Sequence, residues 1–67
     1  MTASYQDRVC TEKSELDIKI EKLELFIVSS SSAFESLGEG EKSRLRVQLA
    51  IMQAYSQVLG ERIANFK

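Results

Sequence analysis

The sequence predicts an all-α protein: a long helix, a short connecting helical turn and a second long helix, assembled as a compact helical homo-oligomer. Apolar residues recur at steps of three, four and seven over two long segments, which is the periodicity of helix faces. The chain has no proline and only three glycines, so little interrupts such helices. Its 67 residues are expected to form one domain, residues 1–67, which alone would bury about 60% of its unfolded surface. A domain this small needs a disulfide, a metal or oligomerisation, and one cysteine without any histidine leaves oligomerisation.

The first long helix is expected over residues 4–28. Ser4 is a suitable N-cap, and Asp7 stands three residues later as the partner of a capping box. The apolar residues of this segment are spaced to form one inward stripe: Val9, Leu16, Ile20, Leu23 and Ile27. The charged residues on the opposite surface are expected to be mostly solvated: Asp7, Lys13, Asp17, Lys19, Glu21, Lys22 and Glu24.

A run of serines, residues 29–32, is expected to end that helix as a hinge, because serine hydroxyls compete for backbone hydrogen bonds. Ser32 and Glu35 match a second capping box, which predicts a short helical turn over residues 32–37. Two large apolar residues of this turn are expected to plug one end of the core: Phe34 and Leu37. Gly38 is then expected to end the turn.

The second long helix is expected over residues 41–65, after a Gly-Glu-Gly segment. One apolar stripe is expected to face the first helix, with Ser56 in its remaining slot: Leu45, Leu49, Met52, Leu59, Ile63 and Phe66. A second stripe lies beside it: Val47, Ile51, Ala54 and Val58. The apolar surface therefore exceeds the roughly 100° arc that a one-sided helix needs. The second stripe is expected to form the contact between protomers, since such a patch is unusual on a monomer.

Charge and composition exclude several classes of protein. Nine Lys and Arg stand against ten Asp and Glu, so no net basic field exists to attract long nucleic acid. No apolar run reaches the roughly 18 residues of a membrane span. The first residues lack the order of a signal peptide and the lone cysteine fits a reducing compartment, so a cytoplasmic protein is expected. Cys10 has no histidine to activate it, which favours a structural or exposed thiol over a nucleophile, and no metal or cofactor is expected.

Six cationic or aromatic residues are suited to an anionic ligand: Tyr5, Arg8, Lys19, Lys22, Arg44 and Arg46. Arginine offers phosphodiester oxygens a planar fork and lysine offers them a mobile charge. A tyrosine ring offers a flat face on which a base stacks. The spacing alone leaves the alternative open that the cations are ordinary surface charge and that the tyrosine belongs to the core.

Residues along nearly the whole chain resemble a family of small tailed-phage proteins. The first helix carries Tyr5-Gln6-Asp7-Arg8-Val9, Glu12-Lys13, Glu15-Leu16, Lys19, Glu21-Lys22-Leu23 and Phe26-Ile27. The rest of the chain carries Phe34-Glu35-Ser36-Leu37, Arg44-Leu45-Arg46-Val47-Gln48-Leu49, Met52, Tyr55 and Gly60-Glu61-Arg62-Ile63. In these residues the chain is similar to the anti-CBASS cyclic-oligonucleotide sponges (anti-CBASS protein two), which sequester the second messengers of a bacterial abortive-infection defence. The likeness is one of helical pattern and scattered identities, without a catalytic signature.

The resemblance implies a homohexamer in the cytoplasm of the infected bacterial host, which binds messengers without cleaving them and so blocks CBASS effector activation. Cyclic dinucleotides such as cyclic GMP-AMP would lie between paired protomers, where Tyr5 stacks on a base. Either Lys19 or Lys22 would contact the phosphates. Arg8, which shares a helix face with Tyr5, is a further candidate for this site. Cyclic trinucleotides such as cyclic tri-adenylate would lie on a threefold axis and contact Arg44 and Arg46. The serine run 29–32 departs from the family pattern and leaves ligand preference open.

Two other functional classes fit the same sequence. The first alternative is a structural or adaptor helical protein that binds another protein through the apolar stripe of its last helix, and it predicts no small-molecule ligand. The second is a small nuclease or phosphodiesterase, which the absence of histidine and of clustered Asp and Glu metal ligands disfavours. Recovery of intact ligand from a heated complex separates binding from cleavage.

Overall fold

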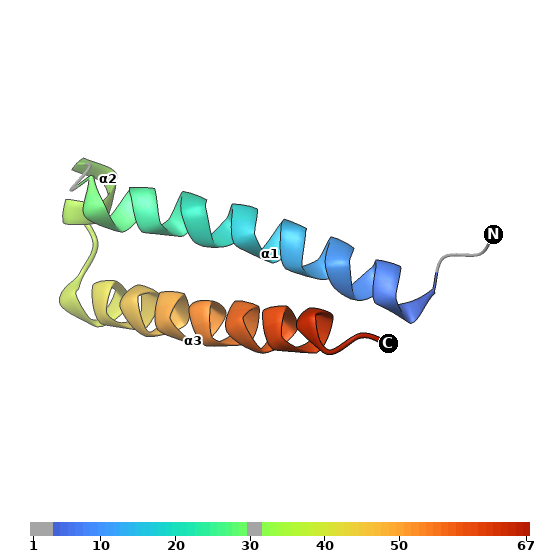
Figure 1. Ribbon diagram of the computed structural model, residues 1–67. Coiled ribbons are helices and arrows are strands. Elements are labelled where there is room, and N and C mark those ends of the chain that lie inside the picture. The colour runs from blue at the N-terminus through green and yellow to red at the C-terminus, as the bar shows by residue number, and fades with distance from the viewer. Residues whose placement is uncertain (1–3, 30–31) are drawn as a thin grey trace.

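The chain folds as an antiparallel helical hairpin, seen in a computed structural model that describes residues 4–29 and 32–67 (Figure 1). Helix α1 spans Tyr5–Val28, α2 spans Ser32–Glu35 and α3 spans Glu39–Ala64. Figure 1 shows α2 at one end of the hairpin, while α1 begins and α3 ends at the opposite end. The prediction of two long helices joined by a short one is therefore confirmed for the described residues. Two residues of the predicted serine hinge, 30 and 31, lie outside them.

Helix α1 begins with the predicted capping box. Ser4 has an extended backbone (φ −83°, ψ 170°), and its Oγ accepts a hydrogen bond of 3.3 Å from the backbone N–H of Asp7. In return, the backbone N–H of Ser4 donates to Oδ2 of Asp7, also at 3.3 Å. A cap of this kind is worth about 0.5–2 kcal/mol. It fixes the residue at which α1 begins, and so the place of Tyr5 in its first turn.

Helix α3 begins two residues earlier than the sequence pattern predicts, at Glu39 rather than residue 41. Gly38 is its N-cap, with an extended backbone (φ −67°, ψ 158°) and not the left-handed one that ends a helix, and its C=O accepts from the N–H of Lys42 at 3.0 Å. Two glutamates in the first turn favour this start, because the N-terminal end of a helix attracts negative charge. Gly40, which the prediction places before the helix, lies inside it.

The seam between α1 and α3 contains the two predicted inward stripes. Leu59 is completely buried and Val9 nearly so, while the other apolar members of both stripes are half-buried. Ser56, which fills the remaining slot of the α3 stripe, is buried as well. The three- and four-residue spacing therefore predicted correctly which face of each long helix points inward.

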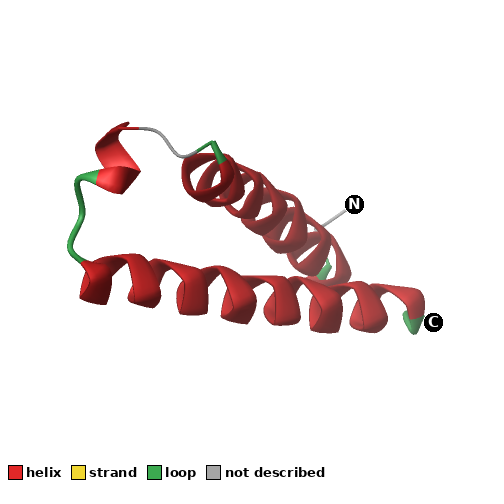
Figure 2. Cartoon of the chain, turned by 90° about the vertical axis from the view of Figure 1, so that its left-hand side faces the viewer, coloured by secondary structure: helices red, strands yellow, loops and turns green. Residues whose placement is uncertain are grey.

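The two long helices diverge toward the end that carries α2, as Figures 1 and 2 both show. Phe34 of α2 is only 1% exposed and so closes this wider end, as predicted for the short turn. Its ring meets the ring of Phe26 edge to face, with 5.5 Å between centroids and 86° between planes. Such pairs contribute about 0.5–1.5 kcal/mol beyond the burial of area. Helix α2 thus holds an aromatic plug in place.

One copy of the hairpin is elongated and leaves much apolar surface uncovered. It measures 49 × 18 × 15 Å, and its radius of gyration is 15.2 Å, whereas a compact chain of this length has about 11 Å. Its accessible surface is 4956 Å², against about 4300 Å² expected for a folded monomer of this mass. The large apolar side chains that remain exposed are Tyr5, Ile18, Leu25, Val28, Val47, Ile51, Tyr55 and Val58. In the described part of the chain, no helix is long and apolar enough to cross a membrane.

Candidate functional site

The candidate residues for a cyclic dinucleotide lie on one flank of α1. All four candidates are exposed: Tyr5, Arg8, Lys19 and Lys22. Together with Glu12 and Glu15 they form a series in which each residue follows the previous one by three or four positions. Residues at these spacings are neighbours on a helix surface. The flank is therefore continuous, with an aromatic and a cationic residue at one end and two cations at the other.

A single chain does not bring the two ends of this flank together. With a rise of 1.5 Å per residue, Lys19 lies about 21 Å from Tyr5 along the axis of α1, and Lys22 about 25 Å. These lengths are too great for one small ligand to touch the tyrosine and the lysines of the same helix. A site that uses both needs a second chain.

The middle of the flank is acidic. A shallow surface groove of about 260 Å³ runs beside it, lined by Asp7, Arg8, Thr11, Glu12 and Glu15. Three carboxylates face one guanidinium in this groove, and its volume lies just below the roughly 300 Å³ at which ligand pockets begin. Phosphate would be repelled there. On this flank, the positive charge therefore lies toward the two ends.

The ring of Tyr5 packs against a residue that follows α3. Its ring lies 5.7 Å from the ring of Phe66, at 76° between planes, which is an edge-to-face contact. Tyr5 remains 55% exposed, and an edge-to-face pair leaves at least one ring face open. A base can stack on that face. The alternative that Tyr5 belongs to the core is wrong for the single chain.

Arg44 and Arg46, the candidates for a trinucleotide, lie on different sides of α3. Two residues along a helix turn the side chain by about 200°. Nε of Arg44 donates to Oε1 of Glu41 at 3.1 Å, on an exposed surface. The guanidinium of Arg46 instead lies over the ring of Phe34, 5.4 Å from its centroid. One chain therefore offers one of these cations outward and holds the other against the aromatic plug.

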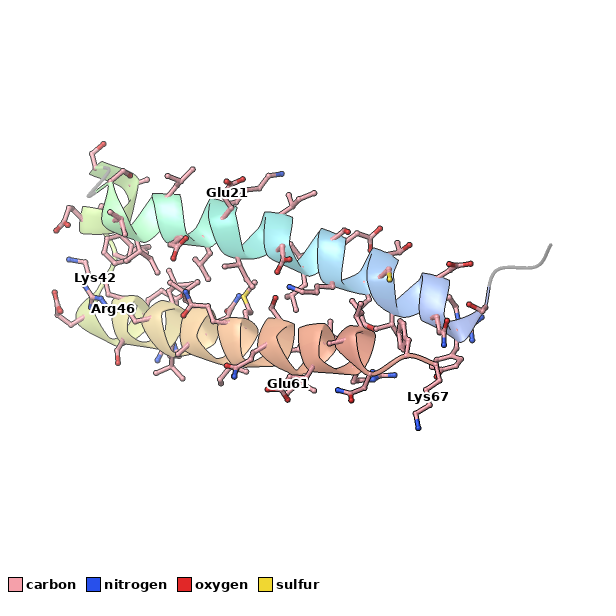
Figure 3. All side chains as sticks on the ribbon, viewed as in Figure 1. Glu21, Lys42, Arg46, Glu61 and Lys67 are labelled. Atoms are coloured by element: carbon pink, nitrogen blue, oxygen red, sulfur yellow. The ribbon has the colours of Figure 1, made fainter. Side chains whose placement is uncertain are left out.

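Lys42 is a third cation at this end, and the sequence pattern did not single it out (Figure 3). It is only 9% exposed, and its Nζ lies 5.6 Å from the centroid of Phe34. It donates to Glu35 at 3.3 Å and to Glu39 at 3.4 Å. Burial alone would lower the pKa of Lys42, but the two carboxylates outweigh it and raise the pKa above its usual value. The spacing of Glu39 and Lys42, three residues apart, was the signal available in the sequence.

A polar cluster crosses the seam where the sequence pattern predicted solvated charge. Nζ of Lys13 donates to Oδ2 of Asp17 at 2.9 Å and to Oγ of Ser56 at 2.8 Å, and Oγ of Ser56 donates to Oδ1 of Asp17. The prediction of solvated charge is therefore corrected for Lys13, which is half-buried and donates to the serine of the opposite helix, whereas Asp17 stays exposed while it accepts from that serine. Hydrogen bonds from Ser56 and then Lys13 lower the pKa of Asp17.

Some hydrolases use a contact between a serine and a lysine for catalysis, but the surroundings of Ser56 do not favour such a role. Ser56 is buried, and its hydroxyl proton is already donated to Asp17. The side chain of Lys13 passes close to Gly60, where an added Cβ would lie 3.4 Å from Cε of the lysine. No substrate has access to the serine in this packing. The cluster instead sets the register of α1 against α3.

The described residues carry few other groups suited to catalysis or metal binding. Cys10 is a free, exposed thiol. Residues 4–29 and 32–67 contain no group of three or more cysteine or carboxylate side chains placed to hold a metal ion.

The predicted contact surface between protomers lies on the side of α3 that faces away from α1. All four residues of this surface are exposed: Val47, Ile51, Ala54 and Val58. The side chain of Ile51 is more exposed, at 64%, than those of the two valines. Burial of a whole aliphatic side chain is worth about 1.5–3 kcal/mol. Helix α3 therefore has a second apolar face that no part of its own described chain covers.

One comparison with known proteins covers nearly the whole chain. A family model described as Sequestin matches residues 3–65. No curated protein and no solved structure matches the chain.

Proposed function

Because the chain belongs to the Sequestin family, whose name denotes sequestration, we propose that it binds and withholds cyclic oligonucleotide second messengers without cleaving them. The ligands are cyclic dinucleotides such as cyclic GMP-AMP, together with cyclic trinucleotides such as cyclic tri-adenylate. The resemblance to anti-CBASS sponges supports a role in a phage-infected bacterium, where lowered free messenger would leave the CBASS effector inactive. The match over residues 3–65 is the observation that carries the proposal.

The layout of α1 supports a site shared between two protomers. An antiparallel copy of α1, related by a twofold axis between Lys13 and Ser14, would place Tyr5 opposite the partner's Lys22 and Arg8 opposite the partner's Lys19. Each pair of protomers would then hold two such sites, one at either end. Aromatic stacking and charge-assisted hydrogen bonds to phosphate would be supplied by different chains. Glu12 and Glu15 would lie between the sites and confine each anion to its end.

Assembly has a natural surface in the uncovered face of α3. We propose that Val47, Ile51, Ala54 and Val58 form contacts between protomers in a homohexamer. Three copies of the chain about a threefold axis would also gather three equivalent arginines, one Arg44 or Arg46 from each chain. This number matches the three phosphates of a cyclic trinucleotide. A single chain supplies too few cations for either ligand, so binding depends on assembly.

Sequestration requires affinity and copy number only. When binding sites exceed the messenger and the dissociation constant lies well below their concentration, most messenger is bound. Helical walls that are formed before binding limit the ordering entropy lost on binding. This role needs neither a nucleophile nor a metal.

The uncovered face of α3 also supports an adaptor function, in which another protein covers Val47, Ile51 and Val58. The discriminating observation is the size of the purified protein. An assembly formed by this chain alone, and stable without any other protein, favours the sponge. A monomer that ignores cyclic oligonucleotides favours the adaptor.

The test is to measure the mass of the purified protein in solution and to titrate it with cyclic GMP-AMP and cyclic tri-adenylate by calorimetry. We expect an oligomer, tight binding, and recovery of unchanged ligand after the complex is denatured by heat. Absence of binding to both ligands would overturn the proposal, and recovery of linear products would replace sequestration by cleavage.

The dependence on assembly is tested by placing a charge on the uncovered face with Ile51→Lys. We expect this variant to lose the oligomer and ligand binding together, because a buried unpaired charge costs several kcal/mol. Gln57→Lys adds the same charge to an exposed position of α3 outside the stripe and should retain both properties. Ligand binding by a dissociated Ile51→Lys monomer would contradict a shared site.

A further inference from the structure

Among the described residues, an aromatic contact joins the proposed stacking residue to the segment after α3. Resting on the function proposed above, we propose that Phe66 is a positioning residue, which orients the ring of Tyr5 for stacking on a nucleobase. Phe66 was predicted only as the last member of the inward stripe. Its edge-to-face contact with Tyr5, at 5.7 Å and 76°, gives it a second role.

Tyr5 needs outside support because of its place in α1. Side chains of a helix lean toward its N-terminal end and lie over the preceding turn. Tyr5 is the first residue of α1, so no preceding helical turn exists beneath its ring. The ring of Phe66, 61 positions further along the chain, lies against it instead.

The backbone around Phe66 is fixed by the end of α3. Asn65 is the C-cap, and its Nδ2 donates to the carbonyl of Glu61 at 2.8 Å. The backbone N–H of Phe66 donates to the carbonyl of Ile63 at 3.2 Å, which continues the turn for one more residue. A longer contact of 3.5 Å runs from Nε2 of Gln6 to the backbone oxygen of Lys67. These bonds hold the segment after α3 beneath the first turn of α1.

Orientation of the ring before binding changes affinity, because a rotamer that is already ordered loses less entropy when the ligand arrives. The contact holds Tyr5 through a ring edge or one ring face, so a face remains for the base. Aromatic pairs of this kind correspond to roughly a two- to tenfold change in an equilibrium constant. The expected effect of losing Phe66 is therefore a measurable fall in affinity with the site still present.

The test is a double-mutant cycle on cyclic GMP-AMP affinity, measured by calorimetry for the wild type, Phe66→Leu, Tyr5→Ala and the double variant. We expect Phe66→Leu to weaken binding about three- to tenfold and Tyr5→Ala to weaken it more. In the double variant, the loss should equal that of Tyr5→Ala alone. Phe66→Tyr keeps an aromatic edge and should restore affinity to within about twofold of the wild type.

Solution mass and the urea midpoint separate orientation from folding, since both should be nearly unchanged in Phe66→Tyr. A ligand-free measurement adds a second readout: in a Tyr55→Phe background, where Tyr5 is the one tyrosine left in the sequence, the near-UV circular dichroism of Tyr5 should fall in Phe66→Leu. Full affinity in Phe66→Leu would overturn the inference, as would additive losses in the double variant or full affinity in Tyr5→Ala. If the wild type binds no cyclic oligonucleotide, the proposed function itself fails, whereas the dichroism still reports whether Phe66 orders Tyr5.

Discussion

The two ends of the hairpin hold aromatic pairs of nearly the same geometry in different surroundings. Phe26 and Phe34 meet at 5.5 Å and 86°, and Tyr5 and Phe66 meet at 5.7 Å and 76°. Phe34 is 1% exposed, whereas Tyr5 is 55% exposed. The same contact therefore completes the core at one end, and at the other it supports a ring that is still available to a ligand.

The difference follows from how the helices are arranged. At the α2 end the long helices diverge, and α2 lies at that end (Figure 2). Its Phe34 is buried there against the ring of Phe26. Lys42 and Arg46 then lie over the Phe34 ring, so its cation-binding capacity is already used within the chain. At the other end α1 begins at Tyr5 itself, and Phe66 supports the ring without enclosing it. The pair geometry alone therefore does not show which ring is open to a ligand, whereas the exposure of the ring does.

The largest effect expected from this comparison is that of Phe34→Ala on stability. Truncation of a buried phenylalanine costs about 3–5 kcal/mol, which is a large part of the total for a small domain. Phe66→Ala, at the open end, should cost clearly less because its partner is half exposed to water. Urea unfolding at one fixed protein concentration measures both, since the stability of an oligomer depends on concentration. Equal losses would mean that the two ends contribute alike to the fold.

Much of the fold could be predicted from the sequence, because local physics determines it. The capping box at Ser4 needs only residues three apart, and the inward stripes need only the helical period. Leu59 and Val9 are buried as that period predicts. The start of α3 could not be placed in the same way, because a glycine in a Gly-Glu-Gly segment suggests a linker while the acidic first turn stabilises a helix.

Prediction of the candidate site reached less far. Residue chemistry singled out Tyr5 and the cations as candidates, but the support of Tyr5 by Phe66 depends on the antiparallel register of α1 and α3, which no local pattern contains. Charge spacing likewise predicted a solvated Lys13 and did not show that its side chain reaches the opposite helix. Ser56 was the available signal, because a serine in an apolar stripe needs a polar partner when it is buried.

The middle of the seam fixes how the two ends are placed relative to each other, and its contribution should depend on pH. The pKa of Asp17 is lowered below its usual 3.8 in the folded state by Ser56 and Lys13. A depressed pKa means that the carboxylate stabilises the fold above its unfolded pKa, and that this contribution is lost as the pH falls through the lower folded value. The wild type should therefore be more stable than Asp17→Asn near pH 6, and the difference should shrink below about pH 4.

Urea midpoints of both proteins across this range provide the measurement. Because other carboxylates titrate in the same range, only the difference between the two proteins is interpreted. Glu21→Gln removes an exposed carboxylate further along α1 and provides the control. A difference that stays constant down to the lowest pH would show that Asp17 acts through packing and not through its charge.

The smallest effect concerns the cation over the closed aromatic pair. Arg46→Gln removes a guanidinium that lies 5.4 Å from the Phe34 centroid, and an exposed cation–π contact is worth about 0.5–1 kcal/mol. Arg44→Gln is the matched control, because Arg44 is a neighbouring arginine whose exposed pair with Glu41 contributes little to stability. We expect a lower urea midpoint for Arg46→Gln than for Arg44→Gln. The gap should disappear in a Phe34→Leu background, where no ring remains beneath the cation. A gap that persists in this background would mean that Arg46 stabilises α3 without the aromatic plug, and that its charge is as available to a ligand as that of Arg44.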